Sequence, residues 1–423
     1  MGKPLEGVRV LDLSHVIAGP LASFYLAQLG AEVIKIESPQ GGDVMRAARA
    51  GAADGDTPTG FAALNAGKRS LAVDIRQAAG AELVRTLAAT ADVFIENFRP
   101  GVVARHGLDY EALRAVRPDI VYCSISGYGQ QGAWAGRGAY DHVVQALTGM
   151  MMMSGDSPDA PPLKVGFPVI DVAVGMLGAL SIVAALHRRA REGVGQYIDA
   201  SMAQAATMLM YPNASAYLTH RVEPQRVGNR GYTGSPTADT YRCADGWLAT
   251  AANTPAQFRK LTAVLGLEHL CEDGAAIDLA AFHAPGGGFV VAKDLPRLRQ
   301  LFNDAFARQP AARMEERLNA VGVPAARVRR LGEFLDEVQG GGKLTLEPLA
   351  FAQGARTVRT PGLGFACAGG DAPPTAGAPT LGQDSLALLA ELGLDAEQQA
   401  ALQAAQVVRG AETQDLQPTE SPA

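Results

Sequence analysis

The chain has 423 residues, of which 48% are hydrophobic and 19% charged, a composition that excludes intrinsic disorder and provides ample apolar surface for packing. At this length a single hydrophobic core seldom suffices, so two domains are expected. The formal net charge of −6 and the lack of a dense basic run argue against a nucleic-acid-binding surface, although an anionic ligand needs only a few local cations.

The cysteines and the start of the chain bear on its location. Cys123, Cys243, Cys271 and Cys367 lie far apart without a CxxC pair, which indicates neither a disulfide framework nor a zinc site and suits a reducing compartment. The opening MGKPLEGVRVLDLS has no signal-peptide pattern, and Glu6 stands where a myristoylation signal has Ser or Thr. A cytoplasmic protein is expected.

The most apolar stretch, residues 165–186, is long enough to raise the question of a membrane span. It contains Asp171 and several glycines, and no aromatic or basic belt flanks both of its ends. We therefore expect a buried helix and no membrane association.

Short β-branched runs alternate with helical stretches in the first third of the chain. The pattern predicts strands at 8–14, 32–37, 70–75, 92–98 and 120–126, and helices at 20–30, 79–90 and 110–116. Such alternation is typical of βαβ units. The expected fold class is therefore α/β, with a mostly parallel sheet covered by helices on both faces.

The next segments lead toward Asp171. Residues 127–138 (GYGQQGAWAGRG) are predicted to form a glycine-rich loop. A helix is expected at 140–152 and a strand at 163–170, followed by the apolar helix after Asp171. Residues 224–239 are rich in Gly, Pro and Thr and are predicted to mark a domain boundary.

The rest of the chain predicts a smaller domain and a mixed C-terminal region. The expected elements are a strand at 247–251, a helix at 255–265, a glycine-rich interruption at 286–288 and further helices to about residue 320. The Pro- and Gly-rich residues 361–379 are expected at the surface. One or two helices are predicted at 385–406, and a disordered tail from Gly410.

Several common site signatures are missing. The turn after the first strand reads SHVIAGP where a nicotinamide enzyme has G-x-G-x-x-G, and no GxxxxGK[ST], HExxH or GxSxG motif occurs. The seven histidines are scattered singly, so no metal site is predicted. Doubly wound folds bind ligands at the C-terminal ends of their strands, which indicates the loops at 15–20, 37–46, 97–105 and 126–140.

Asp171 is an acid enclosed by apolar residues directly before the predicted helix. One interpretation is a helix N-cap, a position that aspartate favours. The other is a nucleophile, because a carboxylate half-removed from water attacks a thioester better than a solvated one. The two interpretations are compatible.

The strand-end loops also carry glycines and cations with two interpretations each. The glycines either form a surface loop or allow the backbone to approach a ligand closely. These glycines are Gly127, Gly129 and Gly132. The cationic side chains are either solvated surface charges or phosphate-binding groups. These residues are Arg46, Lys68, Arg69, Arg99 and Arg105.

Motifs over nearly the whole chain give it a family resemblance. They include PLEGVRVLDLSHVIAGP, GAEVIKIESPQGGD, NAGKRSLAVDI, ADVFIENFRPG, ISGYGQQG, GAYDHVVQALTGM, GFPVID, GVGQYIDASM, DGWLATAANTPAQF and GVPAARV. With these motifs in this order, the chain resembles the class III CoA-transferases, the family of formyl-CoA transferase, carnitine CoA-transferase and α-methylacyl-CoA racemase.

The resemblance implies the catalytic residues. Asp171 matches the family's nucleophile, which attacks an acyl-CoA thioester to give a mixed anhydride and then an aspartyl-CoA thioester. Tyr140 and Asp141 match the aromatic residue and the acid near the thioester. The racemases carry a histidine base at about the Tyr140 position, whereas here His142 lies two residues on. This difference favours transfer over racemisation.

The resemblance also implies the CoA-binding residues. CoA is expected as a cosubstrate, with no tightly bound cofactor. An apolar rim suits its adenine, and a guanidinium suits its phosphates. The implied residues are His15, Val16 and Ala18 in the first loop and Asn97, Phe98 and Arg105 after a later strand.

The fold that the resemblance implies is an interlocked homodimer with a Rossmann-like large domain and a smaller α/β domain. The predicted limits are 1–222 for the first part of the large domain, 223–325 for the small domain, 326–409 for the return to the large domain and 410–423 for the tail. The expected partners are an acyl-CoA, a carboxylic acid and a second copy of the chain, with no nucleic acid and no membrane.

Two segments depart from the family pattern. Residues 381–385 read LGQDS where the family has LGEHT, and residues 280–294 of the small domain are atypical. The acids are therefore not predicted, although a wall near Tyr232–Thr237 is expected to select them. Two alternatives stay open, an acyl-CoA racemase or epimerase of the same fold and a CoA-binding protein without catalysis.

Overall fold

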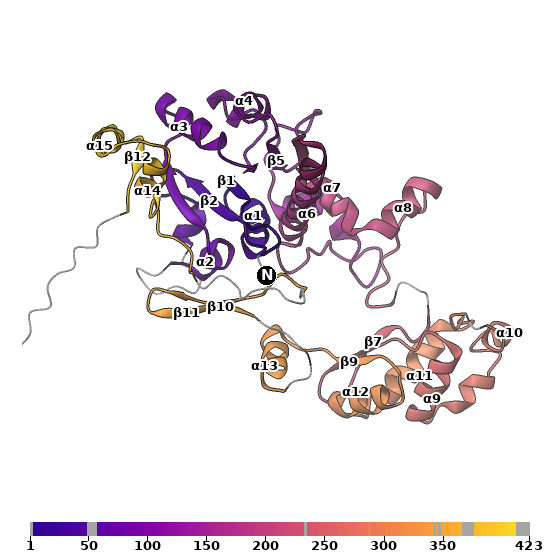
Figure 1. The fold of residues 1–423 in the computed structure, drawn as a ribbon. Helices are drawn as coiled ribbons and strands as arrows, with labels where there is room; N and C mark the ends of the chain where they lie inside the picture. Colours follow the sequence, from indigo (N-terminus) through magenta and orange to yellow (C-terminus); the bar gives the residue numbers. More distant parts are fainter. Residues whose placement is uncertain are drawn as a thin grey trace, which may run out of the picture. The chain divides into compact units, whose positions relative to one another are not determined.

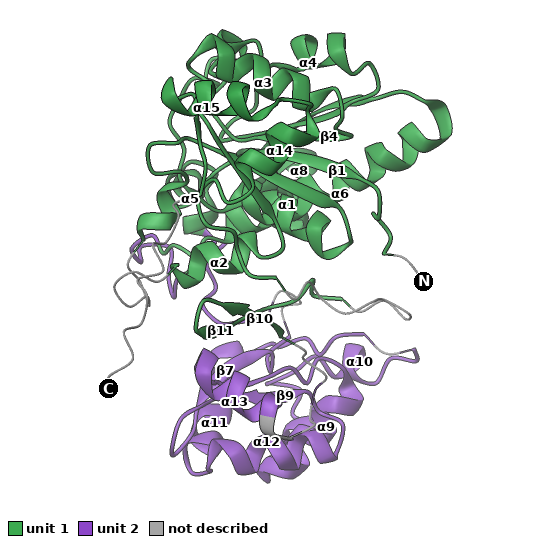
Figure 2. Ribbon diagram, turned by 60° about the vertical axis from the view of Figure 1, so that its left-hand side comes forward, with its two compact units in different colours: residues 1–152, 163–224, 347–423 green, residues 153–162, 225–346 purple. Residues whose placement is uncertain are grey.

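The structure, a computed structural model, describes residues 3–48, 57–231, 235–286, 288–341, 344, 348–365 and 376–411. The chain divides into two compact units, which Figure 2 colours separately. Unit 1 comprises residues 1–152, 163–224 and 347–423, and unit 2 comprises residues 153–162 and 225–346.

A seven-stranded sheet forms the centre of unit 1. Its strands are β1 (Arg9–Leu13), β2 (Glu32–Glu37), β3 (Arg69–Val73), β4 (Val93–Glu96), β5 (Val121–Ser126), β6 (Gln196–Ser201) and β12 (Val408–Arg409). They lie in the order β12-β3-β2-β1-β4-β5-β6, and every neighbouring pair is parallel except β12 with β3. The predicted α/β class with a mostly parallel sheet is confirmed.

Helices cover both faces of this sheet (Figure 1). One face packs against α1 (Ala18–Gln28), α6 (Val169–Glu192) and α7 (Met202–Leu209), and the other against α3 (Ala78–Ala88), α4 (Tyr110–Val116) and α14 (Ser385–Glu391). β1 contributes to both cores, because Val10 belongs to the first and Leu11 and Leu13 to the second. This alternation is the period of two that extended strands impose.

Smaller elements complete unit 1. They are α2 (Thr59–Asn65), α5 (Asp141–Leu147), α8 (Tyr211–His220), α15 (Ala396–Ala404) and the antiparallel pair β10 (Leu349–Gln353) and β11 (Arg356–Thr360). Phe61 of α2 packs with Phe351 and Val358 of that pair in a small core of their own.

Unit 2 is built on an antiparallel sheet of β7 (Asp239–Arg242), β8 (Trp247–Thr250) and β9 (Ala325–Arg327). Its helices are α9 (Pro255–Leu265), α10 (Leu279–Phe282), α11 (Leu295–Ala307), α12 (Ala311–Ala320) and α13 (Leu331–Gly341). Because β9 pairs with β8, residues 326–346 group with this unit rather than with the large one. The domain assignment stays a prediction, and the expected tail beyond residue 411 lies outside the described residues.

α1 and α6 pack closely because glycines of α6 face α1. A Cβ built on Gly175 would lie 2.7 Å from the Ala18 carbonyl oxygen, and one on Gly178 would lie 3.4 Å from the Ala22 Cβ. From the first contact to the second, the residue numbers increase in both helices, so α1 and α6 run parallel with their N-termini at the same end. The glycines inside the apolar stretch therefore serve the contact between these helices.

Two lysine–carboxylate pairs are enclosed within unit 1. Lys68 Nζ lies 3.0 Å from Asp12 Oδ2 and Lys35 Nζ lies 3.0 Å from Asp43 Oδ2, with every side chain at most 1% exposed. Burial alone would raise the pKa of Asp12, but Lys68 and Lys35 hold it well below its usual range. Removing one partner of such a pair leaves an uncompensated charge and costs about 3–5 kcal/mol.

Two predicted elements are wrong. Residues 163–168 form no strand, and α6 begins at Val169. The β-branched residues there suggested a strand, but Pro168 has no N–H to donate to a neighbouring strand. The helix predicted at 140–152 ends at Leu147, because Gly149 adopts φ 79° and a 3-10 turn follows.

α6 has the length and hydropathy of a membrane-crossing helix, the only such helix in the described part of the chain. Within unit 1 it packs against α1, α7, β5 and β6, and Ile170, Val174 and Ile182 are fully buried there. Core helices of soluble proteins share the same length and hydropathy.

Candidate active site

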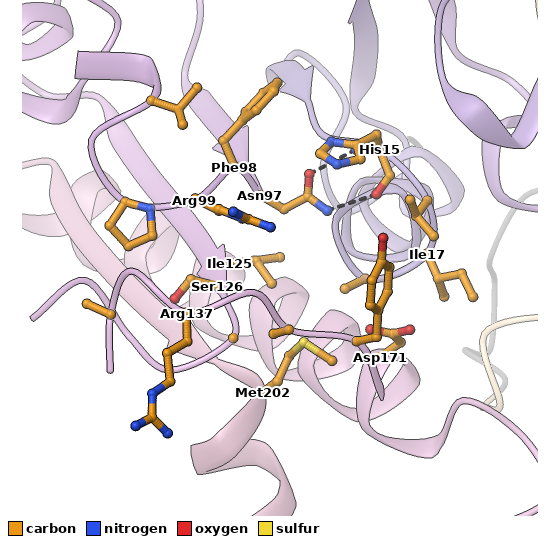
Figure 3. A pocket seen from close by; sticks show the side chains of 18 residues that line it. His15, Ile17, Asn97, Phe98, Arg99, Ile125, Ser126, Arg137, Asp171 and Met202 are labelled. Carbon is orange, nitrogen blue, oxygen red and sulfur yellow. Dashed lines mark hydrogen bonds between the residues drawn. The ribbon is translucent and has the colours of Figure 1, made fainter. Parts of the chain in front are cut away.

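A cavity of about 420 Å³ opens beyond the C-terminal ends of β1, β4 and β5, at the N-termini of α1 and α6 (Figure 3). Doubly wound folds bind ligands at this position. The cavity, here called the Asp171 pocket, brings together the predicted site residues His15, Val16, Ala18, Asn97, Phe98, Tyr140 and Asp171. It is also lined by Ile17, Arg99, Pro100, Val102, Ile125, Ser126, Gly127, Ala135, Arg137, Ala139 and Met202.

The loop after β1 is held at His15 by the side chain of Asn97. The Asn97 carbonyl oxygen accepts from the His15 N–H at 2.9 Å, and its amide nitrogen donates to the His15 carbonyl at 2.8 Å, as the dashed lines in Figure 3 show. The His15 ring lies 5.2 Å from the Phe98 ring between centroids. Burial lowers the pKa of His15, so the imidazole is mainly neutral at neutral pH.

The next residue, Val16, is strained. Its φ of 68° is a left-handed conformation that β-branched residues avoid. The Val16 N–H lies 3.2 Å from both Asp43 carboxylate oxygens, and Lys35 donates to the Ser14 carbonyl at 2.8 Å while pairing with Asp43. The buried Lys35–Asp43 pair therefore holds a strained turn at the pocket. Strain of this kind concentrates at functional sites.

Asp171 is the third residue of α6, and the N-cap of this helix is Pro168. The interpretation of Asp171 as the N-cap is therefore wrong, although its carboxylate still lies in the first turn, where the helix dipole favours negative charge. Burial, together with the negative charge of Asp141, raises the pKa of Asp171 to about 6. At neutral pH the group is thus an incompletely solvated carboxylate that faces a cavity.

The Asp141 carboxylate contacts the backbone of α6. Its Oδ2 accepts from the Ile170 N–H at 2.7 Å and from the Asp171 N–H at 3.0 Å, so a residue of α5 caps the N-terminus of α6. This contact supports the position of Asp171. A direct catalytic role for Asp141 stays a prediction.

Tyr140 immediately precedes α5 and lines the Asp171 pocket with 70% of its surface exposed. The ring of His142 is stacked 6.5 Å from the Tyr140 ring between centroids. The described lining of the pocket includes Tyr140 and not His142. The side chain at the position where the resemblance implies a racemase's histidine base is therefore Tyr140, and His142 is not part of the described lining.

A second cavity, of about 500 Å³, shares His15, Phe98 and Val102 with the first. It lies beyond the C-terminal ends of β1, β2 and β3 and is lined by two arginines, Arg76 and Arg105. We call it the Arg105 pocket. The two cavities are therefore neighbours along the strand ends, and all the predicted site residues except Asp141 line one or both of them.

The candidate cations divide into two groups. Three are engaged in ion pairs within unit 1, Arg46 with Glu37, Lys68 with Asp12 and Arg69 with Glu32. The other two line the cavities, Arg99 in the Asp171 pocket and Arg105 in the Arg105 pocket.

Sequence analysis did not single out Glu96, which directly precedes the pocket residue Asn97, or several residues of the pocket wall, Met202 among them. Glu96 ends β4, is 2% exposed and accepts from the Phe98 N–H at 2.8 Å, and burial raises its pKa to about 7. Its place directly before Asn97 in the ENF motif was a signal that pointed to it. Met202 lines the Asp171 pocket from the start of α7, and it is the last residue of the GVGQYIDASM motif, which was the signal that could have found it.

The structure describes no group of three or more His, Cys, Asp or Glu side chains that would hold a metal ion in residues 3–48, 57–231, 235–286, 288–341, 344, 348–365 and 376–411. From the wall expected to select the acids, Tyr232, Thr233 and Gly234 lie outside these ranges. The location of that wall stays a prediction.

Comparisons with known proteins identify the family of this α/β chain. The family model of CoA-transferase family III matches residues 5–385, so the chain belongs to this family. It is a class III CoA-transferase, as the resemblance implied.

Individual relatives agree with this assignment. The chain is 40% identical over 275 residues to the succinate–glutarate CoA-transferase of Agrobacterium fabrum, a match that covers 64% of this chain and 68% of that protein. It is 35% identical over 340 residues to the succinyl-CoA:mesaconate CoA-transferase of Haloarcula hispanica, covering 79% and 82%. A solved CaiB/BaiF family protein from Brucella suis matches with a TM-score of 0.78 at 30% identity, covering 93% and 100%.

We expect Asp141→Asn to lower the pKa of Asp171. If the ionised carboxylate reacts, transfer by the wild-type enzyme falls as the pH decreases through about 6. Without the neighbouring negative charge, the residual rate of Asp141→Asn should persist to lower pH. The measurement is the rate of CoA transfer against pH for both proteins. The effect would be contradicted if the pH at which the transfer rate falls on the acid side were the same in Asp141→Asn as in the wild type, or higher.

Proposed function

We propose that the enzyme moves CoA from an acyl-CoA to a free carboxylic acid through covalent intermediates on Asp171. The observation that carries the proposal is the Asp171 carboxyl, partly buried in the first turn of α6 and lining the same cavity as the His15 and Asn97 loops. A carboxylate partly removed from water is a better nucleophile toward a thioester than a solvated one. Family membership supports the same chemistry.

The proposed first half begins when an Asp171 oxygen attacks the thioester carbonyl. The C–S bond breaks, CoA leaves as a thiolate, and an anhydride joins Asp171 to the acyl group. The thiolate then attacks the aspartyl carbonyl, which releases the donor acid as a carboxylate and leaves an aspartyl-CoA thioester. Thiolate is a good leaving group and a strong nucleophile, so both steps are accessible.

The second half repeats these steps in reverse. The acceptor carboxylate attacks the aspartyl thioester and releases CoA thiolate, which then attacks the acceptor's carbonyl in the new anhydride. A new acyl-CoA forms and the Asp171 carboxylate is restored. The apolar side chains of Ile17, Ile125 and Met202 in the cavity wall help to exclude water, to which the anhydride would otherwise be lost.

Dicarboxylic acids are the proposed substrate class. The names of the relatives from Agrobacterium fabrum and Haloarcula hispanica contain succinate, glutarate and mesaconate, which are acids with two carboxyl groups, and succinyl-CoA, the CoA thioester of such an acid. We therefore place short dicarboxylic acids first among the candidate donors and acceptors of this enzyme.

The proposal is tested by incubating the enzyme in D2O with succinyl-CoA or a 2-methylacyl-CoA and a panel of dicarboxylic and monocarboxylic acids, with products read by mass spectrometry. We expect new CoA thioesters of dicarboxylic acids, and a rate for Asp171→Ala that is lower by roughly 1,000-fold or more, because removing a nucleophile abolishes the covalent route. Hydroxylamine added during turnover should convert Asp171 to a hydroxamate that peptide mapping locates.

Other results of this experiment have clear meanings. Deuterium at the α-carbon of a 2-methylacyl-CoA without any new thioester would identify a racemase and overturn the proposal. Full transfer by Asp171→Ala would remove Asp171 from the chemistry. Thioester binding without turnover would identify a CoA-binding protein.

We also propose a path for CoA through the two neighbouring cavities. The thioester would lie in the Asp171 pocket, beside the His15–Ala18 turn and Asn97. The nucleotide would extend past the Phe98 ring into the Arg105 pocket. The arginine there supplies charge-assisted hydrogen bonds that suit a phosphate.

This path predicts that Arg105→Gln raises the KM for acyl-CoA by roughly 10- to 100-fold, since hydrogen bonds to charged groups contribute about 1.5–3 kcal/mol. The effect on kcat should be small, because the nucleotide lies away from the reacting carbonyl. Steady-state kinetics measures both constants. Arg114→Gln on α4, an exposed arginine paired with Glu111, is the matched control and should change neither. An unchanged KM in Arg105→Gln would reject the path.

A homodimer is the proposed assembly. Large apolar side chains are exposed on two helices of unit 1, including Leu180 of α6 at 66% and Leu218 of α8 at 71%. Exposed apolar surface of this kind marks protein interfaces. The resemblance to an interlocked family supports a second copy of the chain as the partner.

We expect sedimentation analysis to give twice the mass of one chain, and Leu180→Arg to shift the protein toward monomer or aggregate by burying a charge at the interface. Val116→Arg is the control, because Val116 is an exposed apolar residue of α4 on the opposite face of the sheet. A monomeric wild-type protein would contradict the proposed assembly.

A further inference from the structure

A buried glutamine connects α5 with the segment that leads to Asp171. Gln145 is 1% exposed, and both ends of its amide are engaged. Its Nε2 donates to Asp141 Oδ1 at 2.5 Å, and its Oε1 accepts from the Val165 N–H at 2.8 Å. The other oxygen of Asp141 accepts from the N–H groups of Ile170 and Asp171.

These bonds hold the segment before α6 at both of its ends. Gln145 binds the segment at Val165, and Asp141, one turn earlier on the same helix, binds it at Ile170 and Asp171. Gly166 and Phe167, between the two attachments, are exposed to solvent. The position of the Asp171 carboxyl therefore depends on these bonds to α5 as well as on the packing of Val165, Val169 and Ile170 against the core.

We propose that Gln145 is a positioning residue for the transfer reaction, acting through Asp141 on Asp171. The inference rests on the function proposed for Asp171. Gln145 lines neither the Asp171 pocket nor the Arg105 pocket, so contact with a substrate does not account for a buried amide that is bonded at both its oxygen and its nitrogen. A satisfied buried amide holds the carboxylate that it binds in one orientation.

The directions of the four hydrogen bonds allow a charge-swap test. In Asp141→Asn the new amide faces the amide of Gln145, so one bond of the set is lost in every orientation of the two amides. In Gln145→Glu two carboxylates face each other. The variant that carries both substitutions restores every bond. Its amide at position 141 accepts from α6 and donates to the new carboxylate at position 145, and that carboxylate still accepts from Val165.

The experiment compares the wild type, both single variants and the double variant D141N/Q145E. Gln28→Glu, which buries a carboxylate at the last residue of α1, is the control for an added buried charge. Each single variant should lose roughly 10- to 100-fold in kcat, with a KM for acyl-CoA changed by less than about threefold. The double variant should regain kcat to within about threefold of the wild type.

The pH profile provides a readout that a purely structural role would not move. In the double variant the negative charge lies at position 145 rather than 141, one side chain further from Asp171. The transfer rate of the double variant should therefore fall at lower pH than that of the wild type. A double variant no faster than the slower single variant would overturn the proposal. So would a Gln145→Glu protein with wild-type kcat, or a Gln28→Glu protein with the same loss.

Thermal unfolding of the four proteins tests the coupling without catalysis. The single variants should unfold at lower temperature and the double variant close to the wild type. If the wild type shows no Asp171-dependent transfer, the proposed function fails. In that case the unfolding temperatures alone decide whether Gln145 and Asp141 act as a pair.

Discussion

The close parallel contact between α1 and α6 is the constraint on which the site depends. Gly175 and Gly178 let the two helices lie side by side, so both N-termini open onto one cavity. The start of α1 supplies the turn around His15, and the first turn of α6 supplies Asp171. A side chain at Gly175 would meet the Ala18 carbonyl and push the two helix ends apart. This explains why so apolar a helix contains glycine where a larger residue would bury more surface.

The second constraint is electrostatic, because two carboxylates meet at the N-terminus of α6. This helix end offers unpaired N–H groups and a favourable dipole for negative charge. Asp141 occupies the N–H groups of Ile170 and Asp171, whereas the Asp171 carboxyl faces the cavity with a pKa raised to about 6. One carboxylate therefore stabilises the helix, and the other keeps the basicity that a nucleophile needs in the proposed reaction. A single carboxylate that accepted these backbone hydrogen bonds would be too well stabilised to act as the nucleophile as well.

How much of this structure the sequence predicts depends on how far apart along the chain the interacting residues lie. The strands of the central sheet are predictable because alternating burial, as in Val10 and Leu11, is a local pattern. Asp171 was found through family motifs, since an acid before an apolar helix is equally a cap. The strand predicted at 163–170 is wrong partly because of the local Pro168, but the bonds that hold this segment instead come from far along the chain: Gln145 binds Val165 across 20 positions, and Asp141 binds the Asp171 N–H across 30. Bonds of that range leave no periodic signal in the sequence.

The surroundings of Asp12 and Asp171 in unit 1 shift the pKa values of these two carboxyl groups in opposite directions. Lys68 and Lys35 surround Asp12 and hold its pKa below the usual range, which suits a group that only supports structure. Asp171 has Asp141 rather than a lysine as the neighbour that affects its pKa most after burial. A lysine beside Asp171 would stabilise its carboxylate and weaken it as a nucleophile. The buried Lys35 instead bonds to the Ser14 carbonyl and pairs with Asp43, so it supports the strained Ser14–Val16 turn of the cavity and is not the neighbour that sets the pKa of the acid facing it.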